Sequence, residues 1–245
     1  MDVTGLQELI EEAEAMDTSI YTEGSKAVLA EAIAKAKAAA EAAESEEAVQ
    51  AAMDTLTEAM NSMEEKYINP FEDVEEGKWY YDAVEWGVKN KIVNGLTATT
   101  FGPKVSCTRG QIVTLIWRAV GEPKAENPVN KFADVKEGKY YYEAVLWAVE
   151  EGIVNGLTDT SFGPEETCTR AQMATFLYRY VGEPNMDDVV SPFIDVEAGK
   201  WYSDAAVWAS LDGVINGYEG GIFAPKDIVT RDQTVTMLYR FFTGE

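Results

Sequence analysis

Three arginines have the clearest potential chemistry, because each stands at the same place in one of three copies of a short motif. The motif reads Thr-Arg-x-Gln, and an apolar stretch with helical periodicity follows each copy. A threonine three residues before a glutamine forms a capping box, which places the arginine at the first position of the helix. The helix dipole favours anions at this end, so a cation there suggests a function. The residues concerned are Thr108, Arg109, Gln111, Thr169, Arg170, Gln172, Thr230, Arg231 and Gln233.

These arginines suit the binding of a carboxylate. Backbone N–H groups left free at the start of each helix, together with the guanidinium, would form a receptor for an anion. The alternative is structural, with each arginine paired to a nearby aspartate. In the third copy Asp232 follows Arg231, and an acid there would weaken the attraction for an anion. We therefore expect Arg109 and Arg170 to be the working sites.

Other repeated residues have both a structural and a ligand-binding interpretation. Three aspartates suggest a metal site, but each lies in a turn before a helix, where capping of backbone donors is favoured, with Arg118, Arg179 or Arg240 as partner. Helical tryptophans are favoured as core, whereas the aromatic residues before them suit packing and sugar stacking equally. The Asn-Gly pairs are favoured as turns needing positive φ, with donation to a sugar as the alternative. The sets are Asp73, Asp134 and Asp195; Trp86, Trp147 and Trp208; Trp79, Tyr140 and Trp201; and Asn94-Gly95, Asn155-Gly156 and Asn216-Gly217.

Composition disfavours several classes of function. The 245 residues have a net charge of −23, which argues against nucleic acid as a partner, and they include no histidine, the commonest general base at neutral pH. Two cysteines, Cys107 and Cys168, are too few for a disulfide framework, and Val229 at the third equivalent position indicates apolar packing. The sequence has neither an 18-residue apolar run nor a start typical of a secretory signal. We expect no catalytic residue, metal, cofactor or membrane insertion.

The elements that position these residues recur at a fixed offset of 61 residues. Each unit predicts a helix before the Asn-Gly pair, a loop, and a second helix after the Thr-Arg-x-Gln motif. Glycine and proline then mark the end of the second helix in the first two units. One such unit is too small to bury its own core, so we expect three units in a pseudo-threefold arrangement with grooves between neighbours.

The segment before the repeats is rich in alanine and glutamate and predicts a slender three-helix bundle, which makes the whole chain all-α. Ser25 and Ser45 stand where helix N-caps are expected. Its many glutamates predict a solvated face. Asn69-Pro70 then interrupts the helical pattern. The expected domains are residues 1–66 for the bundle and 67–127, 128–188 and 189–245 for the repeats.

The repeated pattern resembles the S-layer homology domain. It reads Phe-x-Asp-Val, Trp/Tyr-Tyr, Ile-Val-Asn-Gly, Phe-Gly-Pro and Thr-Arg-x-Gln in sequence, with Val-Ile-Asn-Gly and Phe-Ala-Pro in the third unit. The resemblance implies anchoring of an extracellular bacterial protein to peptidoglycan-linked anionic polysaccharide, often through pyruvylated sugars. It also implies that Arg109, Arg170 and Arg231 contact the acidic sugar in grooves between repeats. The segment Tyr21-Thr22-Glu23-Gly24-Ser25, with its later Leu56-Thr57-Glu58-Ala59-Met60, resembles FIVAR-type modules of bacterial surface proteins.

Two departures bear on the function. The family motif usually ends in glutamate, whereas all three copies here end in glutamine, which keeps the capping box but removes a carboxylate. The third unit also has Gly-Tyr-Glu-Gly-Gly in its loop, so we expect its groove to be degenerate or differently selective. The leading hypothesis is a non-catalytic wall-binding module. The alternatives are a structural or protein-binding repeat, and a glycoside hydrolase that uses two carboxylates.

Overall fold

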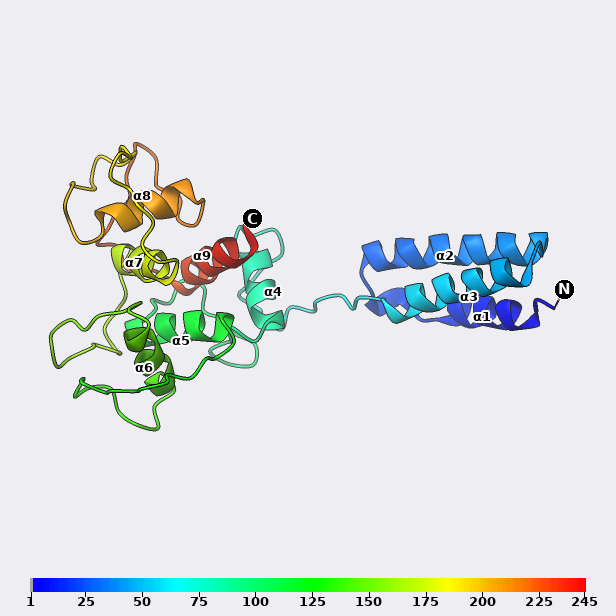
Figure 1. Cartoon of the computed structure of the whole chain (residues 1–245), viewed down its shortest axis with the longest axis horizontal. Coiled ribbons are helices and arrows are strands. Elements are labelled where there is room, and N and C mark those ends of the chain that lie inside the picture. Colours follow the sequence, from blue (N-terminus) through cyan, green and yellow to red (C-terminus); the bar gives the residue numbers. More distant parts are fainter. Residues whose placement is uncertain (1) are drawn as a thin grey trace. The chain divides into compact units, whose positions relative to one another are not determined.

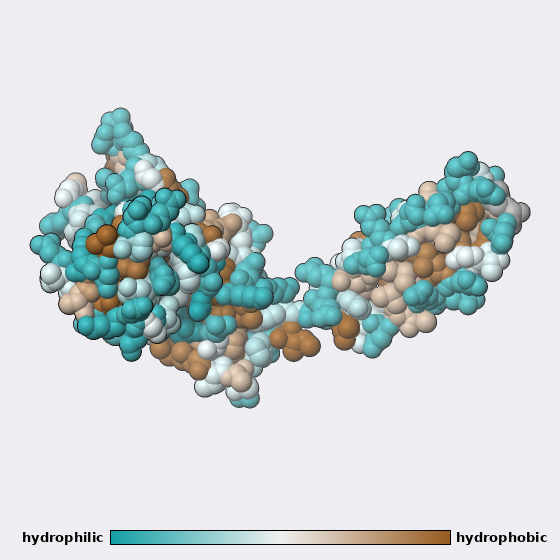
Figure 2. All heavy atoms as spheres, turned by 60° about the horizontal axis from the view of Figure 1, so that its bottom comes forward, coloured by the Kyte–Doolittle hydropathy of each residue, from teal (hydrophilic) through white to brown (hydrophobic). Residues whose placement is uncertain are grey.

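The computed structural model describes residues 2–245, which form two compact units that meet between Ile68 and Asn69 in the sequence. Every regular element in these residues is a helix, which confirms the all-α prediction (Figure 1). None of these helices is long and apolar enough to cross a membrane. Figure 2 shows hydrophilic residues over much of the visible surface, with apolar residues gathered in smaller patches.

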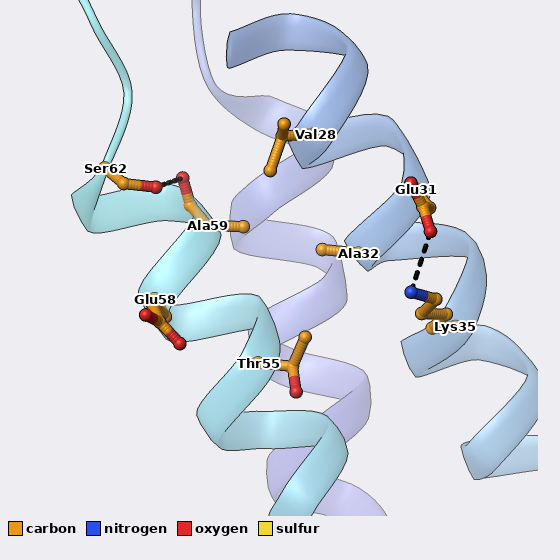
Figure 3. A pocket seen from close by; sticks show the side chains of 8 residues that line it. All are labelled: Val28, Glu31, Ala32, Lys35, Thr55, Glu58, Ala59 and Ser62. Atoms are coloured by element: carbon orange, nitrogen blue, oxygen red, sulfur yellow. Dashed lines mark hydrogen bonds and ion pairs between the residues drawn. The ribbon is translucent and has the colours of Figure 1, made fainter.

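The first unit is the predicted three-helix bundle. Its elements are α1 (Thr4–Ala15), the short 3-10 helix η1 (Thr18–Ile20), α2 (Glu23–Ala42) and α3 (Glu46–Asn61). Leucines and isoleucine fill the centre, while alanines allow the helices to approach closely. Figure 3 shows Ala32 of α2 and Ala59 of α3 in the hollow between these helices, with the ion pair Glu31–Lys35 at its edge. The likeness to FIVAR-type modules stays a prediction.

The caps of this bundle correct one expectation. Ser45 does cap α3, because its hydroxyl accepts a hydrogen bond from Ala48 N at 3.1 Å. Ser25 is not the cap of α2, since it lies inside the first turn, and Thr22 caps this helix by accepting from Ser25 N at 3.3 Å. Thr22 also belongs to the segment that pairs with the chain after α3, through Thr22 N and Glu64 O at 2.8 Å. A tertiary contact therefore fixes where α2 begins.

The second unit contains three copies of a helix, a loop and a helix. The first helices are α4 (Tyr81–Lys89), α6 (Tyr142–Glu150) and α8 (Ser203–Leu211). The second helices are α5 (Arg109–Ala119), α7 (Arg170–Tyr180) and α9 (Arg231–Thr243). The second helix of each repeat packs on the first helix of the next, so that α5 lies on α6, α7 on α8 and α9 on α4 (Figure 1). This exchange of partners explains how units too small for a core of their own obtain one.

A ring of backbone hydrogen bonds closes the array around its axis. Cys168 N donates to Cys107 O at 2.9 Å, Val229 N to Cys168 O at 3.0 Å, and Cys107 N to Val229 O at 3.0 Å. Each repeat therefore donates to one neighbour and accepts from the other, which confirms the pseudo-threefold arrangement. All three side chains are buried, as apolar packing predicts, and burial raises the pKa of the Cys168 thiol to about 12.

Aromatic side chains form much of the core. Trp147 and Trp208 are buried, and Trp86 is partly buried against Tyr239 and Phe242 of α9. The favoured interpretation of these tryptophans as core is confirmed. In each repeat the phenylalanine of the entry turn also packs on the one after the loop, with ring centroids 5.2–5.7 Å apart: Phe71 on Phe101, Phe132 on Phe162, and Phe193 on Phe223.

The Asn-Gly pairs require glycine for another reason than the one expected. None of Gly95, Gly156 and Gly217 has a positive φ, so the prediction that these pairs form turns with a positive φ is wrong. A Cβ on Gly156 would lie 2.3 Å from Thr158 O and 2.5 Å from Cε1 of Phe132. Close approach of the loop carbonyl and the aromatic core therefore excludes any side chain.

Candidate functional site

The capping boxes form as predicted at the starts of α5, α7 and α9. In the first, Gln111 N donates to Thr108 Oγ1 at 3.3 Å while Thr108 N donates to Gln111 Oε1 at 2.9 Å. The second copy makes the same two bonds. In the third, Thr230 N donates to Gln233 Oε1 at 3.2 Å, and Gln233 N donates to Asp232 Oδ1 at 2.8 Å. The arginine accordingly occupies the first helical position in every repeat. Its glutamine uses its carbonyl oxygen locally, which leaves the amide NH2 group as a donor.

The backbone donors at these helix starts are occupied, which corrects the expectation of free N–H groups. Arg109 N donates to Glu166 O at 2.8 Å, and Gly110 N donates to Pro164 O at 2.9 Å. Both carbonyls belong to the loop of the next repeat. The same pairs of bonds join α7 to the third repeat and α9 back to the first. These amides therefore bind neighbouring repeats and are not available to a ligand.

Each arginine side chain crosses the same boundary. Arg109 donates from Nε to Phe162 O at 3.0 Å and from Nη2 to Asn155 O at 2.8 Å. Arg170 and Arg231 make the equivalent bonds to the third and first repeats. The hydrogen-bond partners of these guanidinium groups are therefore carbonyls, and not the aspartates of the structural alternative. Arg109 and Arg170 are buried, and burial lowers the pKa of each guanidinium. A guanidinium has five donors, so these two bonds leave others for a ligand.

Aromatic rings flank the two buried guanidinium groups. Arg109 lies 4.6 Å from the ring centroid of Phe162 and 5.4 Å from that of Phe176. Arg170 lies 4.7 Å from Tyr218 and 5.2 Å from Phe223. These contacts hold the planar group in one orientation and add cation–π attraction.

The repeated aspartates cap backbone donors, as favoured, but these donors lie in the loop after the Asn-Gly pair and not at the start of the following helix. Asp134 accepts from Phe162 N at 2.9 Å, Gly163 N at 2.8 Å and Ser161 Oγ at 2.7 Å, so it fixes the loop after Asn-Gly. Desolvation raises the pKa of Asp134, but these hydrogen bonds outweigh it and the net shift is downward. Asp73 and Asp195 hold the equivalent amides. Among residues 2–245 no group of His, Cys, Asp or Glu side chains is arranged to hold a metal ion.

The expected pairing of these aspartates with the arginines late in each second helix is wrong. Arg179 lies 3.3 Å from Glu183 and Arg118 lies 3.9 Å from Glu122, both one turn further along the chain. Arg179 instead faces a groove between repeats, and so does Arg240. Neither arginine was predicted as a ligand-binding residue, although the seven-residue step from Gln172 to Arg179 places the two side chains on one helix face.

One groove, here called the Arg109 groove, is built from all three repeats. The first supplies Arg109, the second supplies the Asn-Gly loop and the groove-facing side of α7, and the third supplies Trp201, which is 61% exposed. Its volume is about 330 Å3. The lining residues are Arg109, Asn155, Gly156, Leu157, Gln172, Thr175, Phe176, Arg179 and Trp201.

A second groove, the Arg170 groove, follows the same rule shifted by one repeat. It joins Arg170 to the loop of the third repeat, to α9 and to Trp79 of the first, in a volume of about 220 Å3. Its lining includes Arg170, Asn216, Gly217, Tyr218, Gln233, Thr236, Met237, Arg240 and Trp79. In these two grooves predicted residues do come together: the arginine comes from one copy, the Asn-Gly loop and the glutamine from the next, and the exposed tryptophan from the third.

This exchange changes the interpretation of the third copy. Its unusual loop, with Tyr218, lines the groove of Arg170 rather than that of Arg231. Arg231 instead reaches the regular loop of the first repeat through Nη2 and Asn94 O at 2.6 Å. Asp232 is fully buried and accepts from Lys104, so it does not face a ligand beside Arg231. The reasons given for a degenerate Arg231 groove therefore do not apply to it, and which grooves bind ligand stays a prediction.

The repeats match a known family. The S-layer homology domain matches residues 70–113, 131–174 and 192–235, each of which includes one capped arginine. An "Endoglucanase" of Bacillus sp. (strain KSM-635) is 30% identical over 174 residues, which cover 69% of this chain and 18% of that protein. A "Surface-layer 125 kDa protein" of Lysinibacillus sphaericus is 32% identical over 142 residues, covering 56% and 12%. A "Cellulosome-anchoring protein" of Acetivibrio thermocellus is 24% identical over 156 residues, covering 61% and 35%.

The chain spans less than a fifth of the length of the first two of these relatives and about a third of the last. What the four sequences share is the repeat array. The family segments account for more than half of the chain, and each contains the first helix, the loop and the start of the second helix of one copy. The chain therefore belongs to the S-layer homology family, whose domains are typical of proteins anchored at bacterial cell surfaces.

Proposed function

We propose that the repeat array anchors a bacterial surface protein to the cell wall without a covalent bond, by binding an anionic, pyruvylated secondary polysaccharide in its grooves. The placement of arginine carries this proposal. The chain has six arginines, and all six stand at the two positions that repeat every 61 residues. Four of them line the two grooves, Arg109 and Arg179 in one and Arg170 and Arg240 in the other, so a chain with a net charge of −23 places there the side chain best suited to bind carboxylates.

The Arg109 groove offers complementary groups to such a ligand. The guanidinium donors of Arg109 that the loop carbonyls leave unused, together with Arg179, supply positive charge for a carboxylate. The exposed indole of Trp201 offers an apolar face on which a pyranose ring can stack. Gln172 adds its amide NH2 group where the usual family motif has a carboxylate, which suits an anionic partner.

Retention on purified wall polysaccharide tests the proposal, provided that the variants spare the fold. Arg109 is a poor choice because it supports the neighbouring loop, whereas Trp79, Tyr140 and Trp201 are all more than half exposed. The triple variant Trp79→Ala, Tyr140→Ala and Trp201→Ala should fold and lose retention. The exposed Lys35→Gln in the bundle is the matched control and should be retained like the unmodified chain.

Removal of pyruvate from the polysaccharide by mild acid should weaken retention at least about tenfold, because a charge-assisted hydrogen bond contributes about 1.5–3 kcal/mol. Equal retention with and without pyruvate would contradict the proposed ligand chemistry. Retention that disappears only after protease treatment of the wall fraction would favour the alternative of a protein partner. The relatives that are enzymes share only part of their length with this chain, and S-layer homology domains are typically non-catalytic.

A further inference from the structure

The junction between the third and first repeats contains a buried carboxylate that the other two junctions lack. Asp232, the second residue of α9, is fully buried. The equivalent residues at the starts of α5 and α7 are Gly110 and Ala171. Burying a carboxylate costs free energy unless it is paired, so its presence at one junction alone points to a local role.

The partner of this carboxylate comes from the first repeat. Lys104 Nζ lies 2.7 Å from Asp232 Oδ2, and Gln233 N donates to Asp232 Oδ1 at 2.8 Å. Thr230 Oγ1 makes a further short contact with the carboxylate. The hydrogen bond to Asp232 raises the pKa of Lys104, which keeps the ammonium charged. The lysine side chain is otherwise largely exposed, so Asp232 determines where its charge lies.

The ammonium group also reaches the aromatic residues before α4. Lys104 Nζ lies 5.8 Å from the ring centroids of both Trp79 and Tyr80, within the range of a cation–π contact. Trp79 packs edge-on against Tyr80 with centroids 5.2 Å apart. The outer face of Trp79 is exposed and lines the Arg170 groove.

The ion pair thus joins two walls of the Arg170 groove that come from different repeats. One wall is α9, which supplies Gln233 and Thr236, and the other is Trp79. No covalent linker joins these repeats directly, because they are the last and the first in the chain. We propose that Lys104, held by the buried carboxylate of Asp232, is a positioning residue that fixes Trp79 on the wall of the Arg170 groove for stacking on an acidic sugar.

This proposal rests on the proposed function for its ligand but predicts a difference between grooves that the proposed function does not. At the other two junctions, the positions equivalent to Asp232 are occupied by Gly110 and Ala171, and those equivalent to Lys104 by Glu165 and Lys226. Neither junction therefore has a charged residue at this position of the helix. Tyr140 and Trp201 therefore lack this support, and the Arg170 groove alone depends on it. A tryptophan side chain that becomes ordered only when the ligand binds lowers the affinity by a factor of about 2 to 10, relative to one already held in place.

Indole N–H signals in the NMR spectrum of the full chain separate the two grooves, because Trp79 lies in one and Trp201 in the other. The probe is a methyl hexoside with a pyruvate acetal. Lys104→Met should raise the Kd measured at Trp79 by about 2- to 10-fold and leave that at Trp201 unchanged. Lys104→Arg should restore it, and the matched control Lys226→Met should alter neither. An equal change at both tryptophans, or none at Trp79, would overturn the proposal.

A measurement without ligand separates this proposal from the proposed function. In Lys104→Met, the heteronuclear NOE of the Trp79 indole should fall, whereas that of Trp201 should stay constant. The double variant Lys104→Met and Asp232→Ala, which removes the unpaired buried charge, should show the same fall while remaining folded by circular dichroism. An unchanged Trp79 NOE in both variants refutes positioning by Lys104. If the probe shifts neither indole in the unmodified chain, the proposed ligand is wrong, and the NOE alone decides the positioning.

Discussion

Replacing Arg109 by lysine separates the structural role of the arginine from its charge. The guanidinium holds two carbonyls of the next repeat at once, Phe162 O through Nε and Asn155 O through Nη2. A lysine keeps the charge but has one compact ammonium group, which we expect to hold only one of them. Losing one hydrogen bond from a charged donor should lower the free energy of unfolding by about 1.5–3 kcal/mol. For an array of this size the expected fall in Tm is about 3 to 12 °C.

Tryptophan fluorescence is the appropriate assay, because all six tryptophans lie between Trp79 and Trp208, outside the bundle. Thermal and urea unfolding of the full chain, followed at this signal, therefore report on the repeat array. Arg118→Lys is the matched control: its one hydrogen bond to Ile92 O is long, at 3.4 Å, and its ion pair with Glu122 is loose. That variant should lose less than about 0.5 kcal/mol. Equal losses in the two variants, or none in Arg109→Lys, would refute the argument that arginine is required as a link between repeats.

Two further predictions concern the loops that the arginines hold. Hydrogen bonds lower the folded-state pKa of Asp134, so its contribution to stability is present above the ordinary value of about 4 and is lost as the pH falls through the lower folded-state pKa. In Asp134→Asn, the free energy of unfolding should therefore fall less steeply as the pH is lowered below about 4. The control is Asp159→Asn at an exposed position. An unchanged pH dependence in Asp134→Asn, or an equal change in the control, would count against a stabilising role of the Asp134 carboxylate. Gly156→Ala should destabilise the array by about 1–3 kcal/mol in urea unfolding, because its Cβ would overlap Thr158 O and Phe132. Gly24→Ala, with open space around the new Cβ, should cause no loss, and a stable Gly156→Ala would contradict the close-approach argument.

Local sequence signals predicted local structure well. The spacing of Thr108 and Gln111 is enough to predict a capping box, because both partners lie within one helical turn, and all three boxes form. The helical tryptophans were correctly assigned to the core because large aromatic side chains dominate core burial. The fixed offset between copies also predicted the pseudo-threefold closure.

Contacts between repeats could not be derived in the same way. The backbone amides at the start of α5 were expected to be free because the carbonyls that occupy them, of Pro164 and Glu166, lie more than fifty residues further along. Gly156 was assigned a positive φ because the sequence does not show that Phe132 packs against it. The same limitation led to Arg231 and the unusual loop of its own copy being assigned to one groove. The capped arginine of one repeat lies beside the loop of the next repeat, and the spacing within a repeat does not show this.

The ring of hydrogen bonds through Cys107, Cys168 and Val229 leaves the array without ends. Open solenoids add or lose units easily, but they need specialised capping repeats to shield the first and last unit from water. A closed trimer of repeats needs no caps, and each of its units is free to contribute its outer surface to a groove. The cost is a fixed copy number: the in-frame loss of one unit would remove a wall from both grooves at once, and an added unit would have no place in the closed ring. Growth of such a module by gene duplication is therefore expected to proceed by whole triplets.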